Sequence, residues 1–208
     1  IRILTSMYKK LNIEKIENIL DKSIRHDAIV IGWDCAESTT GICVLRSNSK
    51  DIEIILLDTI TTSSKDDMKN RLDFFVMALD KFKQKLPEKK EWRINVIEQP
   101  FLSTNPFSYE ALARFSTAIY LSFKKDVDYQ VFMGANSARS KIGFNLNKEI
   151  EKQGIKPDKI SRGKNKGKDK KIDNKLVIAG FLKRVFDINF SEHDIADGFI
   201  LALAGLTI

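Results

Sequence analysis

The spacing of hydrophobic residues changes along this chain in a fixed order, and that order restricts the folds the chain can adopt. Three apolar stretches that are typical of strands come first, at residues 28–33, 41–46 and 52–60. Helical spacing then alternates with further strand-like stretches up to the C-terminus. An antiparallel meander followed by this alternation predicts an α/β domain whose mixed sheet is covered by helices on both faces.

The remaining elements follow from the same patterns. Helices are expected over residues 64–86, 108–124, 136–142, 172–186 and 191–206, and strands over residues 93–98 and 129–133. The sheet should therefore have five strands. An amphipathic helix over residues 9–25 precedes the first strand. The chain is expected to divide into an N-terminal helical extension, residues 1–27, and one domain, residues 28–208, with a basic insertion near residues 156–175.

Positive charge is concentrated in this insertion. Residues 156–175 contain nine Lys or Arg residues and three acids, so they carry most of the chain's net charge of +7. A local excess of this kind is expected where a protein contacts phosphates. A solvated loop without a partner is the alternative. The lysines of this segment expected to bind DNA are Lys164, Lys166, Lys168, Lys170, Lys171 and Lys175.

The rest of the composition is that of a protein without a membrane span. No stretch approaches the roughly 18 apolar residues needed to cross a bilayer, and residues 1–27 lack the apolar core of a signal peptide. Cys35 and Cys43 form no CxxC motif, so neither a zinc site nor a disulfide framework is expected. We therefore expect a cytoplasmic protein (host cytoplasm if the source is a virus), with an organelle as the open alternative.

Two of the expected strands end in a carboxylate. Asp34 follows the apolar stretch 28–33, and Glu98 ends the stretch 93–98. A charge at the end of a buried strand is costly unless it is paired or binds a metal ion. Asp is also common where a strand turns, so Asp34 alone is ambiguous. If the two strands are neighbours, the two carboxylates converge at one edge of the sheet, where ligands of α/β proteins bind.

A second pair of acids lies on the last expected helix. Asp194 and Asp197 are three residues apart and therefore share a helix face, next to an almost wholly apolar stretch. Two like charges repel each other there unless a cation lies between them. Acids in a first helical turn are also favoured by the helix dipole, which is the alternative. His193 is expected to be a bystander or to lie behind the ligands, with a role as ligand or general base left open.

These four carboxylates suit a hard divalent cation. Oxygen ligands favour Mg²⁺, with Mn²⁺ as a substitute, whereas zinc sites usually use His and Cys. An acidic cluster beside a basic segment points to phosphodiester hydrolysis with two metal ions, one activating a water and the other stabilising the leaving oxygen. The residues predicted to be both catalytic and metal-binding are Asp34, Glu98, Asp194 and Asp197.

At this point the chain resembles the RuvC-like Holliday-junction resolvases, from about residue 28 to the C-terminus. The resemblance implies a ribonuclease H-like fold, a homodimer and Mg²⁺-dependent cleavage of DNA. The chain departs from the bacterial members in having Cys35-Ala36 where Pro-Gly usually follows the first Asp. The matching segments are Ile31-Gly32-Trp33-Asp34, Thr40-Gly41, Ile97-Glu98-Gln99-Pro100-Phe101 and Asp194-Ile195-Ala196-Asp197, which runs into Leu201-Ala202-Leu203.

The resemblance also assigns DNA contacts. Phe101 matches an aromatic residue that family members place near the branch point of the junction. Packing into the core is the ordinary alternative for Phe, but Phe101 lies outside any helical or strand periodicity. The lysine of the family's basic region corresponds to Lys141, or to Lys171 and Lys175, with the register left open.

The leading prediction is a structure-selective, Mg²⁺-dependent endodeoxyribonuclease that resolves four-way junctions or related branched DNA. A ribonuclease acting on RNA–DNA hybrids would use the same carboxylates but would need contacts to 2′-hydroxyl groups. A non-catalytic nucleic-acid-binding module is the alternative outside the enzymes. An actin-like phosphotransferase is disfavoured, because it needs two domains and Gly-rich phosphate loops.

Overall fold

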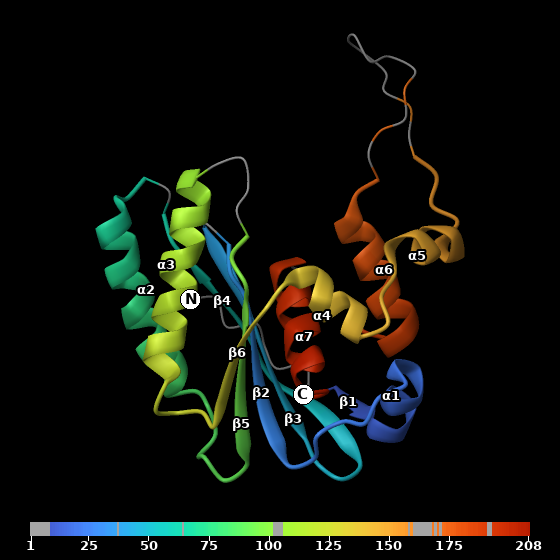
Figure 1. The fold of residues 1–208 in the computed structure, drawn as a ribbon, viewed down its shortest axis with the longest axis horizontal. Helices are drawn as coiled ribbons and strands as arrows, with labels where there is room; N and C mark the ends of the chain where they lie inside the picture. The colour runs from blue at the N-terminus through green and yellow to red at the C-terminus, as the bar shows by residue number, and fades with distance from the viewer. Residues whose placement is uncertain are drawn as a thin grey trace.

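A six-stranded mixed sheet forms the centre of the molecule, in the order β1-β4-β3-β2-β5-β6 (Figure 1). β2, β3 and β4 form an antiparallel meander, and β5 and β6 extend the sheet parallel to β2. The predicted α/β class and mixed sheet are confirmed, with six strands in place of five. The strands are β1 (Lys10–Asn12), β2 (Ala28–Asp34), β3 (Thr39–Ser47), β4 (Asp51–Thr61), β5 (Trp92–Glu98) and β6 (Tyr129–Met133).

The computed structural model describes most of the chain. The residues it describes are 9–36, 38–63, 65–101, 106–157, 159, 168, 170, 172–190 and 193–208, without the side chain of His193.

The additional strand is β1, which the sequence pattern assigned to an N-terminal helix. Leu11 is buried in it and pairs with Ile52 of β4. Asn12 then caps α1 (Ile13–Leu20), because its side chain accepts a hydrogen bond from the amide of Lys15 at 2.9 Å. A strand of three residues is too short to show a period of two, so its one apolar residue was attributed to the helix.

Helices cover both faces of the sheet (Figure 1). α2 (Met68–Lys83) and α3 (Pro106–Phe123) pack on one face and enclose one hydrophobic core. α7 (His193–Gly205) covers the opposite face, together with α1, α4 (Ala135–Lys141) and α6 (Asn174–Phe186), and encloses a second core. The predicted arrangement of helices on both faces is therefore confirmed.

One helix, α5 (Leu146–Gln153), was not expected from the sequence. Its buried residue is Glu149, which accepts two hydrogen bonds from Arg184 of α6, at 2.6 and 2.7 Å. Gln153 also reaches α6 and donates to the carbonyl of Val177 at 2.9 Å. Because α5 faces its neighbour with a carboxylate and an amide, it lacks the apolar stripe by which helices are recognised. α5 and α6 are thus joined on either side of the basic insertion.

Cys35 and Cys43 are both buried free thiols. In the described part of the chain, no helix combines the length and the hydrophobicity that crossing a bilayer requires.

Candidate active site

Asp34 and Glu98 lie side by side at the ends of two neighbouring strands. β2 and β5 are parallel, and Trp33 pairs with Ile97, so the next residue of each strand ends at the same edge of the sheet. The two carboxyl groups share a hydrogen bond. The expected convergence of these two strand ends is confirmed, whereas their role in binding a metal ion stays a prediction.

Two glycines allow α7 to lie close against β2 and β3 next to this edge. A Cβ on Gly41 of β3 would collide with the main chain of Asp194, and a Cβ on Gly32 of β2 would collide with the main chain of Gly198 and Ala202. Only glycine leaves room for this contact. Asp194 is therefore positioned over the sheet by its own backbone.

The four carboxylates interact electrostatically. Burial raises the pKa of Asp34 well above its ordinary value of 3.8, and the hydrogen bond and the charge of Glu98 raise it further. The charges of Asp197 and Asp194 act in the same direction. Burial also raises the pKa of Glu98 above 4.5, although the hydrogen bond with Asp34 opposes that rise. The pair therefore favours one shared proton, held on Asp34.

Two cations balance the acids of α7. Arg139 of α4 donates from Nη2 to Oδ1 of Asp197 at 2.9 Å, and its charge lowers the pKa of Glu98. The ammonium group of Lys175 on α6 lies 3.8 Å from Oδ1 of Asp194. Lys175 was predicted to bind DNA, and the structure brings it to the edge of the carboxylate group.

Arg139 was missed in the sequence. The sequence predicted Lys141 instead, two residues further along α4. Among the described residues, the side chain of Lys141 forms no ion pair with a carboxylate. The carbonyl of Lys141 instead accepts a hydrogen bond from Lys22 at 3.2 Å, on the side of α4 near α1. The sequence does show two cations close together in this helix, Arg139 and Lys141. A helix of seven residues is too short for its pattern to indicate which of the two faces the sheet.

The chemistry of the four carboxylates fits a hard divalent cation, since all their donor atoms are oxygen. Their mutual effect on the pKa of Asp34 also shows an excess of negative charge that a cation would relieve. In the described residues, however, no three Asp, Glu, His or Cys side chains are already arranged to hold one ion. The carboxylates are turned instead towards each other, Arg139 and Lys175. Binding a metal would require these side chains to reorient.

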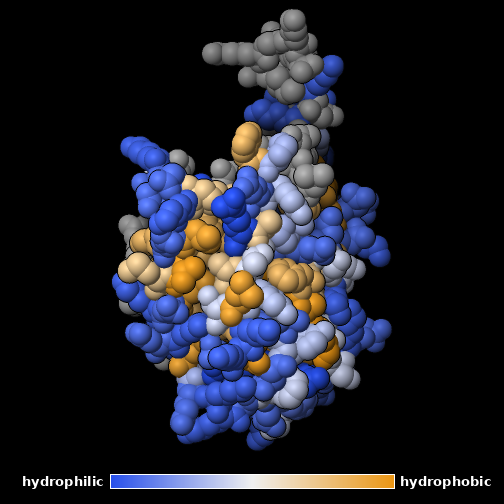
Figure 2. Space-filling view, turned by 60° about the vertical axis from the view of Figure 1, so that its left-hand side comes forward, coloured by the Kyte–Doolittle hydropathy of each residue, from blue (hydrophilic) through white to orange (hydrophobic). Residues whose placement is uncertain are grey.

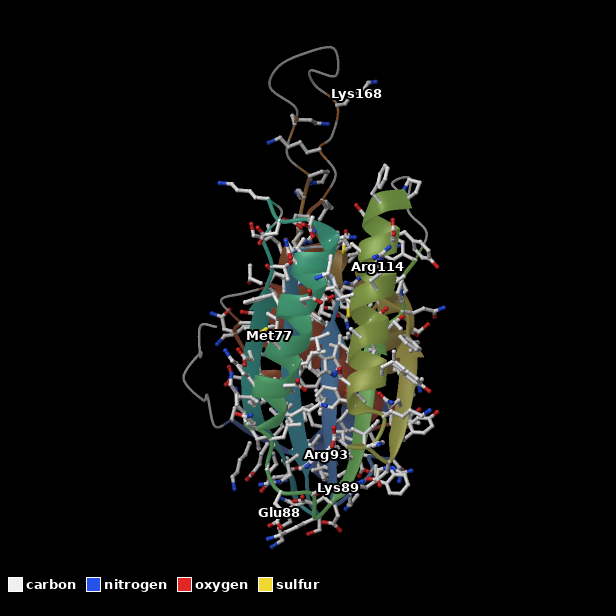
Figure 3. The ribbon with its side chains drawn as sticks, turned by 90° about the vertical axis from the view of Figure 1, so that its left-hand side faces the viewer. Met77, Glu88, Lys89, Arg93, Arg114 and Lys168 are labelled. Carbon is white, nitrogen blue, oxygen red and sulfur yellow. The ribbon has the colours of Figure 1, made fainter. Side chains whose placement is uncertain are left out.

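The other predicted DNA-binding residues fall into two groups. Phe101 is 64% exposed, which excludes the core packing that was its alternative. Lys168 and Lys170 are exposed as well. In Figure 3, Lys168 and Arg93 lie at opposite ends of the sheet. Arg93 is at the start of β5 and Glu98 is at its end, so Lys168 lies beyond the end that carries the carboxylates. Lys164, Lys166 and Lys171 lie outside the described residues, as does the side chain of His193.

Solved structures with this fold include two of RuvC from Thermus thermophilus. RuvC in complex with a Holliday junction substrate is 12% identical in sequence and matches with a TM-score of 0.56 over 85% of this chain and 91% of that chain. Another RuvC structure is 14% identical, with a TM-score of 0.52 over 85% of this chain and 92% of that chain.

A third match is the yeast mitochondrial Holliday junction resolvase Ydc2, which is 13% identical. Its TM-score is 0.52, over 92% of this chain and 82% of that chain. No protein-family model matches the chain, and no curated protein matches its sequence. The likeness therefore lies in the fold.

The fold is ribonuclease H-like, as the resemblance in the sequence implied. Within that class, the matching structures are RuvC-type Holliday-junction resolvases.

Proposed function

We propose that this chain is an endonuclease that resolves four-way junctions or related branched DNA by hydrolysing phosphodiester bonds. The observation that carries the proposal is the meeting of Asp34 and Glu98 with the acids of α7 at one edge of a resolvase fold. A fold alone does not define a reaction. Here the fold and the chemistry of the site point in the same direction.

In this proposal, Asp34, Glu98, Asp194 and Asp197 hold Mg²⁺, with Mn²⁺ as a substitute. When bound there, two such ions would supply an activated water and would stabilise the leaving oxygen. The residues of the chain prepare the site for them. The proton shared by Asp34 and Glu98 must leave, because a protonated carboxyl group is a poor ligand, and Arg139 must release Asp197. Once released, the Arg139 guanidinium is available to a phosphate of the substrate.

The basic insertion supports a nucleic acid as the substrate. Figure 3 shows Lys168 beyond the end of the sheet away from Arg93, which is the end at which β5 reaches Glu98. The ammonium group of Lys175 lies 3.8 Å from Asp194. Cations near an acidic site offset its repulsion of the phosphate backbone.

We further propose that the enzyme acts as a homodimer through the outer face of α2 and α3. A four-way junction is resolved by two incisions, and two copies related by a twofold axis would supply two sites. The two helices form a groove of about 690 Å³ that is lined mainly by apolar or small side chains, among them Leu72, Val76 and Leu121. Figure 2 shows hydrophobic side chains on this side of the molecule, and Figure 3 shows Met77 and Arg114 on the same face. Exposed apolar side chains grouped in this way are typical of protein interfaces.

A ribonuclease acting on RNA–DNA hybrids remains the second candidate, since the same carboxylates serve it. The exposed ring of Phe101 beside Glu98 favours the first, because it would stack on a base that is unpaired at a branch. A continuous hybrid duplex offers no such base.

The deciding experiment compares three labelled substrates: a synthetic four-way junction, a linear duplex of the same sequence and an RNA–DNA hybrid. Each is incubated with the protein in Mg²⁺ and in EDTA. We expect paired incisions in the four-way junction and none in the other two substrates. These incisions should require Mg²⁺ and should be absent with the variant Asp34→Asn. Preferred cleavage of the hybrid would favour the second candidate, and binding without cleavage of any substrate would reduce the protein to a binding module.

A further inference from the structure

A series of hydrogen bonds crosses the sheet on the side of α3. The indole N–H of Trp33 on β2 donates to Oδ1 of Asn95 on β5. Nδ2 of Asn95 donates to Oε1 of Gln130 on β6 at 2.9 Å, and Nε2 of Gln130 donates to the carbonyl of Tyr120 on α3 at 3.1 Å. We call these four residues the Asn95 network. It joins three neighbouring strands to the helix that covers them (Figure 1).

Asn95 is completely buried at the centre of this network. A carboxamide in a hydrophobic core is costly unless its polar atoms are hydrogen-bonded. Both polar atoms of Asn95 have a partner. However, replacing such partners by apolar groups of the same shape can be nearly neutral for stability. Filling the space between the strands therefore does not explain why a carboxamide stands here.

The network has a fixed direction. Each bond runs from a donor nearer β2 to an acceptor nearer α3, and the last acceptor is a main-chain carbonyl in the final turn of α3. Turning over either carboxamide would place two donors against each other. Apolar contacts tolerate sliding, whereas these bonds specify one arrangement. The position of Trp33 relative to β5 and α3 is thus determined.

Trp33 in turn anchors the backbone that carries Asp34. Its ring meets the rings of Phe82 and Phe123 edge to face, with centroids 5.0 and 5.3 Å apart. Asp34 is the next residue and the last of β2. Because side chains alternate along a strand, Asp34 points to the opposite face, which α7 covers. A shift of Trp33 would therefore move the carboxylate as well.

Resting on the proposed function, we infer that Asn95 and Gln130 are positioning residues that act through Trp33 and hold Asp34 against Glu98. The two carboxylates lie on paired strands and repel each other when both are charged, so their strand ends tend to separate. The network opposes this separation from the far face of the sheet. Groups that bind a metal ion must be held to within about 0.5 Å of their working geometry. The network supplies that precision to the end of β2.

The test compares two half-buried glutamines that make the same kind of bond. Gln130 donates to a main-chain carbonyl of α3 at 3.1 Å, and Gln153 donates to one of α6 at 2.9 Å. Gln130→Leu interrupts the network, whereas Gln153→Leu removes an equivalent bond between α5 and α6 and is the matched control. Asn95→Leu is the second network variant. Thermal melting verifies that each protein folds, and Gln130→Leu carries the test if the fully buried site does not tolerate leucine.

The first measurement needs neither metal nor DNA. The change in melting temperature caused by Asp34→Asn is determined in EDTA at pH 7 in the wild type and in each variant, as a double-mutant cycle. It should be equal in the wild type and in Gln153→Leu. In Gln130→Leu and Asn95→Leu it should be smaller by about a factor of two, because a looser β2 lets the carboxylates move apart. The same change in every background would overturn the inference.

The second measurement concerns the proposed function. The affinity for Mg²⁺, measured by calorimetry, should fall by about 10–100-fold in both network variants, as is usual when a group that orients a metal ligand is lost. In junction cleavage, kcat should fall while KM stays the same, because the network lies on the other face of the sheet. Unchanged Mg²⁺ affinity in both network variants, or an equal loss in Gln153→Leu, would overturn the inference. If the wild type neither binds Mg²⁺ nor cleaves DNA, the nuclease proposal fails, and the double-mutant cycle alone decides the positioning role.

Discussion

Replacing Asp34 by Asn should stabilise the folded protein while it abolishes cleavage. Asp34 is half-buried beside Glu98, and the acids of α7 add further negative charge. Asn has nearly the same shape, can donate a hydrogen bond to Glu98 and carries no charge. The substitution therefore removes the cost of desolvating and crowding a carboxylate without opening a cavity. Asp34 is thus expected to lower the stability of the folded protein while it serves the chemistry of the site.

The sign of the effect follows from the raised pKa. The folded protein binds the proton of Asp34 more tightly than the unfolded chain does, so the folded state loses stability as the pH rises above the ordinary value of 3.8. Each unit of pKa difference corresponds to about 1.4 kcal/mol. For a domain of this size, 1 kcal/mol changes the melting temperature by about 2–4 °C. Asp34→Asn should therefore raise the melting temperature at pH 7 by about 3–6 °C for each unit.

The measurement is thermal unfolding in EDTA between pH 4 and pH 8. The difference between variant and wild type should be small at pH 4 and should grow as the pH rises. Adding Mg²⁺ should then stabilise the wild type and leave the variant nearly unchanged. Asp66→Asn, which changes an exposed carboxylate, is the control. A lower melting temperature of Asp34→Asn at pH 7, or a difference that does not vary with pH, would refute the electrostatic reasoning.

Three further predictions follow from the helices and their contacts. Arg139→Gln should tighten Mg²⁺ binding about fivefold by calorimetry, since about 1 kcal/mol of competing ion pair is lost, and unaltered affinity would mean that the pair persists beside the metal. Gly41→Ala should destabilise the protein by roughly 3 kcal/mol in urea unfolding, because the new Cβ meets the backbone of α7, whereas Gly134→Ala, with no atom closer than 3.9 Å, should change little. Leu121→Asp should convert a dimer into a monomer in analytical ultracentrifugation. Leu176→Asp should not, although the two side chains are equally exposed, at 61% for Leu176 and 62% for Leu121. A dimer that survives both changes would place the interface elsewhere.

The sheet and its strand ends were predictable because they depend on short-range patterns. β2 and β5 are apolar stretches that end in an acid, and a parallel pairing brings such ends together without further information. The spacing of Asp194 and Asp197 likewise fixed their common helix face. These features belong to single elements, so each could be read without knowing what packs against it.

The features that were missed depend on contacts between elements. Whether Arg139 or Lys141 faces α7 is decided by the orientation of a helix of seven residues, which tertiary packing sets. α5 is held by the pair of Glu149 with Arg184, whose partners are 35 residues apart. β1 forms because Leu11 and its neighbours pair with β4. In each case the deciding partner is distant in the sequence.

The contact of Gly32 and Gly41 with the main chain of α7 has a consequence for how such a protein can diverge. The position of Asp194 over the sheet is set by backbone meeting backbone, with no side chain in between. Substitutions in the two cores can therefore accumulate without moving Asp194, provided that two positions stay glycine. A site held in this way tolerates change in nearly all of the sequence around it.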